Sequence, residues 1–143
     1  MKKRIEAVLL IIILFLLMII NNKPYKINAT DIALIEMEIT YYMSTGKPTA
    51  SGCKTREGIC AMKKEWLGKT AIVYEYDNGK VGDLIGIYEI LDTGYGRYDS
   101  ETGLGTIEAG KTIDIFVDKK ETGIKLCKQT NSKVYVQIVD AVG

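Results

Sequence analysis

The sequence contains no histidine, only two prolines and a single tryptophan among its 143 residues. Without histidine, the chain cannot form a Ser-His-Asp triad, a Cys-His catalytic pair or a histidine-containing metal site. Its three cysteines are too few for a four-cysteine zinc site, and none of them is spaced as CxxC. Any catalysis must therefore use carboxylates, lysine, tyrosine, cysteine or backbone groups, and we predict neither a metal nor a cofactor.

Long apolar runs are also lacking, with one exception at the N-terminus. Residues 7–20 are all apolar and follow the basic residues Lys2, Lys3 and Arg4. The run is shorter than the about 20 residues that span a membrane, but its length is typical of a signal peptide. Cleavage after Ala29 would place Ile27 where a small residue is usual, so an uncleaved hydrophobic helix is the alternative. We assign residues 1–29 to a signal peptide or membrane anchor and residues 30–143 to an exported domain.

The exported domain lacks an excess of positive charge. The whole chain has a net charge of +1, but residues 30–143 contain 14 basic and 17 acidic residues, a net charge of −3. A mildly acidic domain has no basic surface for nucleic acid, and the chain has no P-loop motif. We therefore predict no nucleic-acid partner.

The three cysteines leave two possibilities open. Cys53 and Cys60 are seven residues apart, so a disulfide between them is possible in an exported protein, with Cys127 left over. The alternative is three free thiols, each packed as a small apolar side chain.

Short β-branched and aromatic runs, separated by turn residues, predict a mainly β domain. The expected strands are residues 35–41, 70–76, 85–91, 112–117 and 133–139. Asn78-Gly79 predicts a tight turn after the second strand. Residues 118–129 predict one short helix with Asp118 as its N-cap, although Gly123 is unfavourable inside a helix. Many short strands with glycine-rich turns and one helix favour a small β-barrel over a parallel α/β sheet.

Asp114 is the first candidate catalytic residue. Alternation along its strand places Asp114 and Phe116 on the face opposite to Ile113 and Ile115. Aspartate is uncommon in strands, and a carboxyl group beside Phe116 is expected to have a raised pKa, which suits a general acid. The alternative is a solvent-exposed aspartate on an edge strand.

Two further segments carry polar groups that suit a site. Asp92, in the string Asp92-Thr93-Gly94, ends a predicted strand and is either a functional carboxylate or part of a turn. Residues 44–52 form a loop of small residues whose amides and hydroxyls could line a sugar or anion site. The alternative for this loop is a flexible turn.

The order of several short motifs resembles the three-aspartate (3D) domain of exported bacterial cell-wall proteins. This domain is related to the barrel of membrane-bound lytic transglycosylase A and to resuscitation-related stationary-phase proteins. The resemblance covers about residues 36–140. It is carried by Thr40-Tyr41, Thr45-Gly46-Lys47-Pro48-Thr49-Ala50-Ser51-Gly52, Gly58-Ile59, Leu67-Gly68-Lys69-Thr70, Asp92-Thr93-Gly94, Ile113-Asp114-Ile115-Phe116 and Val134-Tyr135-Val136.

The resemblance implies a small six-stranded double-psi β-barrel with one short helix, preceded by the N-terminal hydrophobic helix. It implies an exported enzyme at the outer face of the membrane or in the cell wall, where it cleaves peptidoglycan glycan strands. Asp114 and Asp92 match two of the family's aspartates and are the implied catalytic residues. The implied substrate-binding residues are Thr40, Tyr41, Thr49, Ser51, Thr93 and Gly94.

The chain departs from the family pattern at three places. The first family aspartate is absent, and Ala61 or Met62 stands in its place. Tyr95 replaces the usual second glycine after Asp92-Thr93-Gly94, and the interval between Asp92 and Asp114 is 22 residues, about twice the usual length. The additional residues 98–110 include three acidic side chains, Asp99, Glu101 and Glu108.

These departures leave two functions open. A lytic transglycosylase needs only one carboxyl group, which protonates the glycosidic oxygen while the sugar's own C6 hydroxyl attacks C1. We expect Asp114 in this role, with Asp92 supporting the site. The alternative is an inactive barrel that binds glycan or a protein partner, anchored through residues 1–29 if they are not cleaved. A segment 98–110 folded across the cleft would favour the second function.

Overall fold

The computed structural model describes residues 33–141. The signal peptide or membrane anchor that we predict at residues 1–29, including its hydrophobic helix, lies outside the described residues. Within residues 33–141, no helix combines the length and the apolar character that crossing a membrane requires.

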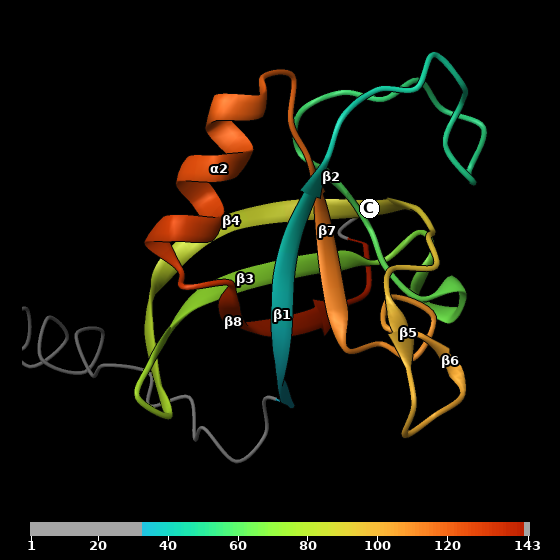
Figure 1. The fold of residues 1–143 in the computed structure, drawn as a ribbon. Helices are drawn as coiled ribbons and strands as arrows, with labels where there is room; N and C mark the ends of the chain where they lie inside the picture. The colour runs from blue at the N-terminus through green and yellow to red at the C-terminus, as the bar shows by residue number, and fades with distance from the viewer. Residues whose placement is uncertain (1–32, 142–143) are drawn as a thin grey trace, which may run out of the picture. The chain divides into compact units, whose positions relative to one another are not determined.

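Six strands pair side by side in a sheet that closes on itself (Figure 1). They are β1 (Leu34–Tyr42), β2 (Ile59–Ala61), β3 (Thr70–Asp77), β4 (Lys80–Asp92), β7 (Thr112–Phe116) and β8 (Lys133–Val139). Their order is β1-β7-β2-β4-β3-β8, and β8 pairs back with β1. The β1–β7 and β2–β4 pairs are parallel, and the other pairs are antiparallel. The mainly β prediction is therefore confirmed.

Alternation of apolar side chains, clearest in β1, β3 and β8, explains why these strands enclose a core. The inward-facing residues pack in one cluster that includes Met37 and Ile39 of β1, and Ile113 and Ile115 of β7. The bounds of the five predicted strands agree with the structure to within one residue, except that β4 begins at Lys80 rather than at residue 85. The predicted Asn-Gly turn is confirmed, because Asn78 and Gly79 both have the positive φ that a two-residue hairpin turn requires.

One helix, α2 (Lys120–Gln129), packs on the barrel beside β1. The prediction of a helix is confirmed, but the prediction of Asp118 as its N-cap is wrong. Lys119 is the N-cap residue, and no side chain caps the helix there. Gly123 is buried where the ring of Tyr41 meets the helix, so a Cβ at this position would lie 2.2 Å from Cγ of Tyr41. The glycine that disfavours the helix locally is thus required by its packing.

Three short elements were not predicted from the pattern. They are strand β2, a 3-10 turn at Lys64–Trp66, and a hairpin of β5 (Tyr98–Asp99) and β6 (Leu104–Gly105). The hairpin lies within the additional residues 98–110, at the lower right of the barrel in Figure 1. The three cysteines are free, with Cys53 exposed and Cys60 buried, so the structure contains no Cys53–Cys60 disulfide.

Candidate functional site

Four residues on adjacent strands form one row across the sheet. Thr40 of β1 pairs with Asp114 of β7, Asp114 pairs with Ala61 of β2, and Ala61 pairs with Asp92 of β4. Since neighbouring strands are about 4.8 Å apart, the backbones of Asp92 and Asp114 are separated by roughly 10 Å. Ala61 lies between the two aspartates.

Asp114 is a half-buried carboxyl group with one side-chain hydrogen-bond partner among residues 33–141. The Thr40 hydroxyl donates a hydrogen bond of 2.7 Å to its Oδ1. Burial raises the pKa of Asp114 above its usual value, the hydrogen bond from Thr40 opposes this shift, and the nearby charge of Asp92 adds to it. A carboxyl group whose pKa is raised by burial holds its proton more readily and suits a general acid.

Asp92 has a different environment, because one of its carboxylate oxygens accepts hydrogen bonds from two backbone amides. The amides of Ala50 and Thr93 each donate a 2.9 Å hydrogen bond to its Oδ1. A β-bulge between β2 and β4 pairs Ala61 with Asp92 rather than with Leu91. Leu91 in turn accepts a hydrogen bond from the amide of Ser51. Asp92 therefore joins the loop of residues 44–52 to the end of β4.

Two other ionisable side chains lie near these aspartates and are held in their neutral forms. Burial raises the pKa of the Tyr42 phenol well above its ordinary value, and the charge of Asp92 adds to the effect. Burial likewise raises the pKa of the Cys60 thiol, with a further contribution from Asp114. Tyr42 also packs edge-on against Phe116, with ring centroids 5.5 Å apart. Both side chains are therefore uncharged near neutral pH and add no positive charge beside the aspartates.

Asp114 opens into a groove of about 370 Å³, within the range of small-molecule sites. One wall comes from β1 and β7, and the other comes from the segment that follows Gly94. We call this space the Asp114 groove. It is lined by Glu38, Thr40, Tyr41, Gly94, Tyr95, Gly96, Arg97, Thr106, Ile107, Thr112 and Asp114. Asp92 is not among the lining residues, so the two aspartates do not converge on one cavity.

The wall that follows Gly94 is held in shape by close backbone contacts. The amide of Thr106 donates a 2.7 Å hydrogen bond to the carbonyl of Arg97, and the amide of Arg97 donates to the Thr106 hydroxyl at 3.2 Å. A Cβ on Gly105 would lie 1.9 Å from the carbonyl oxygen of Tyr95, so only glycine permits this approach. The segment of residues 95–107 therefore has a defined position beside the groove.

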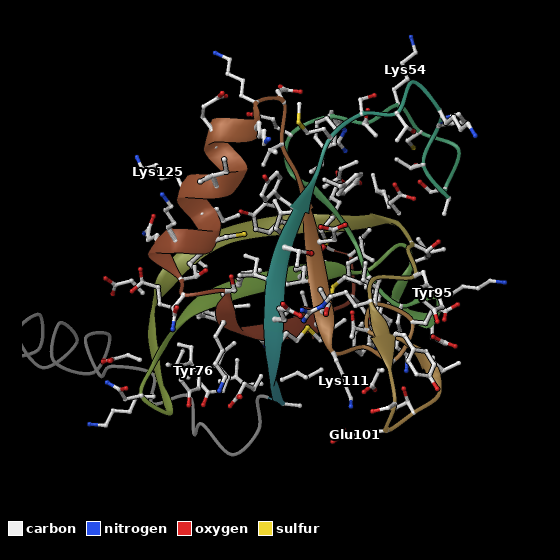
Figure 2. All side chains as sticks on the ribbon, in the orientation of Figure 1. Lys54, Tyr76, Tyr95, Glu101, Lys111 and Lys125 are labelled. Atoms are coloured by element: carbon white, nitrogen blue, oxygen red, sulfur yellow. The ribbon has the colours of Figure 1, made fainter. Side chains whose placement is uncertain are left out.

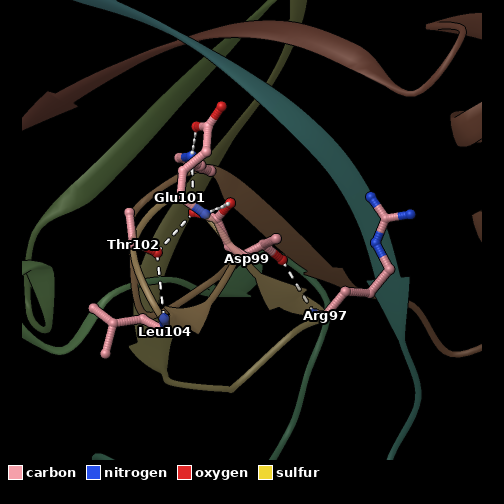
Figure 3. Close-up of polar contacts among 7 residues, drawn as sticks. Arg97, Asp99, Glu101, Thr102 and Leu104 are labelled. Carbon is pink, nitrogen blue, oxygen red and sulfur yellow. Dashed lines mark hydrogen bonds and ion pairs between the residues drawn. The ribbon is translucent and has the colours of Figure 1, made fainter.

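The acidic side chains of the additional segment bind groups of the segment itself and of Lys111, the residue that follows it (Figure 3). Asp99 accepts hydrogen bonds from the Thr102 hydroxyl and the Glu101 amide, and it forms a 2.8 Å ion pair with Lys111. Lys111 also pairs with Glu101, and the two side chains lie together at the lower end of the hairpin in Figure 2. Glu108 accepts a hydrogen bond from the amide of Gly105. None of the three acids lines the groove.

An ion pair crosses from this segment to the barrel. The guanidinium of Arg97 lies 2.5 Å from Oε2 of Glu38, and both residues line the Asp114 groove. Figure 3 shows the Arg97 side chain extending away from the hairpin toward β1. Because Glu38 precedes Thr40 by two residues on the same face of β1, the ion pair lies roughly 7 Å along the groove from the Thr40–Asp114 pair.

The structure brings together only part of the predicted site. Thr40, Tyr41 and Gly94 line the groove with Asp114. Thr49, Ser51 and Thr93 lie at the junction that Asp92 organises. The Thr49 and Ser51 hydroxyls are 2.9 Å apart, and Thr49 also accepts a hydrogen bond from the amide of Cys53.

The loop that contains Thr49 and Ser51 has a separate cavity of about 540 Å³. It is lined by Ser44, Gly46, Lys47, Pro48, Gly52, Lys54 and Thr55, and Figure 2 shows Lys54 at the far end of this loop. Neither predicted aspartate lines this cavity. It is therefore distinct from the Asp114 groove.

Several groove residues escaped the sequence analysis. Alternation would have identified Glu38 and Thr112, because they lie two residues before Thr40 and Asp114 on the same faces of their strands. Arg97, Thr106 and Ile107 carry no such signal, because the path of the additional segment decides their position.

Comparison of the chain with models of known protein families gives no match, and comparison with characterised proteins gives none either.

Proposed function

We propose that the protein is a glycan-cleaving enzyme of the lytic transglycosylase type, acting on peptidoglycan, with Asp114 as its single general acid and base. The observation that carries this proposal is the setting of Asp114. Its carboxyl group is half-buried, has a raised pKa, accepts a hydrogen bond from Thr40 and opens into a groove of suitable size. Such a group can hold a proton and deliver it to a bound ligand.

We also propose that the closed six-stranded sheet is a double-psi β-barrel. Its two parallel pairs, β1–β7 and β2–β4, flank the antiparallel β2–β7 pair. This arrangement, together with the resemblance of the sequence to the three-aspartate domain, supports the assignment. In this fold the central strands β7 and β2 carry Asp114 and Ala61, next to Asp92 on β4.

The proposed reaction balances with one carboxyl group. Protonated Asp114 gives its proton to the glycosidic oxygen, and the bond from C1 to that oxygen breaks. The C6 hydroxyl of the same sugar attacks C1, and its proton returns to the Asp114 carboxylate. The products are a 1,6-anhydro sugar and a free hydroxyl on the leaving sugar, so no water is consumed. The second carboxylate of a glycoside hydrolase is therefore unnecessary.

Asp92 has a supporting role in this proposal. Its Oδ1 is occupied by the amides of Ala50 and Thr93, so it fixes the loop of residues 44–52 and the end of β4. Its charge also raises the pKa of Asp114 across the intervening Ala61. Asp92 is thus a positioning residue, while Thr40, Tyr41 and Gly94 are placed to contact substrate.

The alternative is a barrel that binds glycan or a protein partner without cleaving it. Two points favour it: the first aspartate of the three-aspartate domain is absent, with Ala61 or Met62 in its place, and residues 95–107 form one wall of the groove. In both cases we propose an exported protein at the outer face of the membrane or in the cell wall, held to the membrane through residues 1–29 if these are not cleaved.

The test is digestion of purified peptidoglycan with the full chain in mild non-ionic detergent, read by mass spectrometry. The Asp114→Asn variant keeps the shape of the side chain and an oxygen for Thr40, but it cannot transfer a proton. Asp118→Asn is the matched control, because Asp118 is exposed just beyond the end of the same strand. We expect anhydro-muropeptides from the native chain and the control, and none from Asp114→Asn.

The other outcomes identify the alternatives. Products with reducing ends would indicate a hydrolase, whose second carboxylate would be sought first at Glu38, the other acid that lines the groove. No product, with the protein sedimenting with the glycan, would establish the binding barrel. Full activity of Asp114→Asn would overturn the assignment of the acid.

A further inference from the structure

The Asp114 groove is lined by a cationic side chain, Arg97, which forms an ion pair with an acidic side chain of the same groove. Among the described residues that line it, Arg97 is the only cation, while Glu38 and Asp114 are acids. Arg97 pairs with Glu38 at 2.5 Å, and 75% of its side chain is exposed. An exposed arginine with one carboxylate partner can exchange that partner for another carboxylate of similar geometry.

The backbone of Arg97 is held by two hydrogen bonds, while its side chain is largely exposed and has one partner among the described residues, Glu38. Its carbonyl and amide are both hydrogen-bonded to Thr106, which keeps the start of the side chain beside the groove. Glu38 is on β1, whose pairing with β7 fixes the distance from Glu38 to Asp114. A carboxylate that replaced Glu38 would therefore lie roughly 7 Å along the groove from the Thr40–Asp114 pair, a distance comparable to one sugar ring.

We infer that Arg97 is a specificity-determining residue that binds the free carboxylate of a muramic acid without a stem peptide, next to the bond at Asp114, and that Glu38 occupies the carboxylate position in the unliganded protein. This inference rests on the proposed function for the identity of the ligand as an acidic sugar. Arg97 accounts for selection of an acidic sugar over a neutral one. Glu38 competes with that sugar and keeps the guanidinium oriented when the groove is empty of ligand.

The chain offers a matched control for this ion pair. Arg56 and Glu89 form a second exposed Arg–Glu pair, outside the Asp114 groove. Their side chains are each 54% exposed, so their removal changes the same charges at a comparable surface position. Any effect of net charge on binding would appear equally in variants of the two pairs.

The experiment compares two sugars that share a ring and differ in one acidic substituent, N-acetylmuramic acid and N-acetylglucosamine. Binding to the full chain in mild non-ionic detergent is followed by NMR shifts of the Gly96 and Thr106 amides, and the amide spectrum of each variant verifies its fold. We expect the acidic sugar to bind about fivefold more tightly, as for a partly exposed ion pair. Arg97→Gln abolishes the preference, Arg97→Lys retains part of it, and Glu38→Gln strengthens binding of the acidic sugar. Arg56→Gln and Glu89→Gln change nothing.

Equal binding of the two sugars, absence of binding, or a preference that survives Arg97→Gln would overturn the inference. Weaker binding of the acidic sugar to Glu38→Gln would also overturn it. These results are independent of cleavage, because neither sugar contains a glycosidic bond to cut. A preference without any digestion of peptidoglycan would refute only the proposed enzyme, whereas digestion without a preference would refute only this inference.

Discussion

Asp92 and Asp114 flank the same residue, Ala61, which pairs with Asp92 on β4 and with Asp114 on β7. The two carboxyl groups nevertheless differ in their hydrogen-bond partners and in their access to the groove. Asp92 is bound by two backbone amides, whereas Asp114 is bound by one hydroxyl and opens into the groove. Burial and the charge of Asp92 both disfavour ionisation of Asp114. This asymmetry predicts distinct behaviour for substitutions at each position of the row.

Replacing the acid with its amide should stabilise the fold at neutral pH. Burial raises the pKa of Asp114 above the 3.8 expected for the unfolded chain. The folded state therefore binds the proton more tightly, and the stability that this provides is present below pH 3.8 and is lost as the pH rises through the folded pKa. Each tenfold difference in acid dissociation constant corresponds to about 1.4 kcal/mol. We expect Asp114→Asn to be more stable than the native chain at neutral pH and similar to it in acid.

Urea unfolding of the native protein and of Asp114→Asn at a series of pH values measures the difference in their stability. The difference in unfolding free energy should be near zero below pH 3.8 and should grow with increasing pH until Asp114 is ionised. Asp118→Asn, an exposed change, should follow the native chain throughout. A native chain that gains stability over Asp114→Asn with increasing pH would show that the Asp114 pKa is lowered instead.

Two threonines beside Asp114 provide a matched pair of substitutions. Thr40 donates a 2.7 Å hydrogen bond to Asp114, and this bond lowers the pKa of the carboxyl group. Thr40→Val should therefore raise the Asp114 pKa further and cost about 1–2 kcal/mol of stability. Thr112→Val makes the same chemical change at a buried hydroxyl that has no hydrogen-bond partner among the described residues. It should leave the Asp114 pKa unchanged and increase stability by about 1 kcal/mol.

Carbon-13 NMR of the Asp114 carboxyl group measures its pKa in both variants, and urea unfolding measures their stability. The two variants should differ in both quantities: Thr40→Val raises the Asp114 pKa and lowers the stability, whereas Thr112→Val leaves the pKa unchanged and increases the stability. If Thr112→Val also moved the Asp114 pKa, the effect would come from general burial rather than from the Thr40 hydrogen bond.

The strands that could be predicted are those with sustained alternation, such as residues 35–41 and 133–139, because a half-buried strand leaves a period of two in the sequence. Strand β2 could not be predicted because Ile59–Ala61 is only three residues long. The first half of β4 was missed because Gly82, Asp83 and Gly86 interrupt the pattern with residues that are uncommon in strands.

The site shows the same division. Asp114 could be identified from the alternation along its strand, and Thr40 was expected only from the resemblance to the three-aspartate domain. Their contact depends on the parallel register of β1 and β7, which no local pattern predicts. The Arg97–Glu38 pair joins residues 59 positions apart. It depends on the path of residues 95–107, which is held by close approach at Gly105 rather than by an apolar period. A contact of this kind leaves no local signal in the sequence.

Introducing an aspartate between Asp92 and Asp114 should lower the stability of the fold. Ala61 is 3% exposed and lies between Asp92 and Asp114, so Ala61→Asp would bury a third carboxylate beside two others. Leaving a buried charge uncompensated costs about 3–5 kcal/mol. Ala61→Asn, which has a similar shape without the charge, is the control and should lose less at neutral pH. The difference in stability between Ala61→Asp and Ala61→Asn, measured by thermal unfolding, should become smaller in acid, where the new carboxyl group is protonated. Equal stability at neutral pH would contradict the prediction.

The thiols should react in an order set by burial. Cys53 is exposed, Cys127 is half-buried and Cys60 is buried. Burial also raises the pKa of the Cys60 thiol and, less strongly, that of Cys127, which reduces the reactive thiolate form. Titration of the unreduced protein with a thiol reagent should show one fast reaction, one slow reaction and a third that requires denaturant. Cys53→Ser should lose the fast reaction alone. Fewer than three thiols in denaturant would indicate a disulfide.

Gly123 provides a test of packing against helix propensity. A Cβ added here would lie 2.2 Å from Cγ of Tyr41, so Gly123→Ala must displace either the Tyr41 ring or α2. Alanine gains about 1 kcal/mol over glycine inside a helix, while overpacking a buried site costs about 1–3 kcal/mol. We expect a net loss of stability in urea unfolding.

Lys125→Ala is the control for Gly123→Ala, because Lys125 projects from the exposed face of α2 (Figure 2) and its loss should change stability little. A second substitution, Tyr41→Ala, removes the ring that the new methyl group meets. In that background Gly123→Ala should become stabilising, because only the gain in helix propensity remains. If Gly123→Ala stabilised the native chain, the ring of Tyr41 would not pack against α2, and the position of Tyr41 beside the groove would have to be revised.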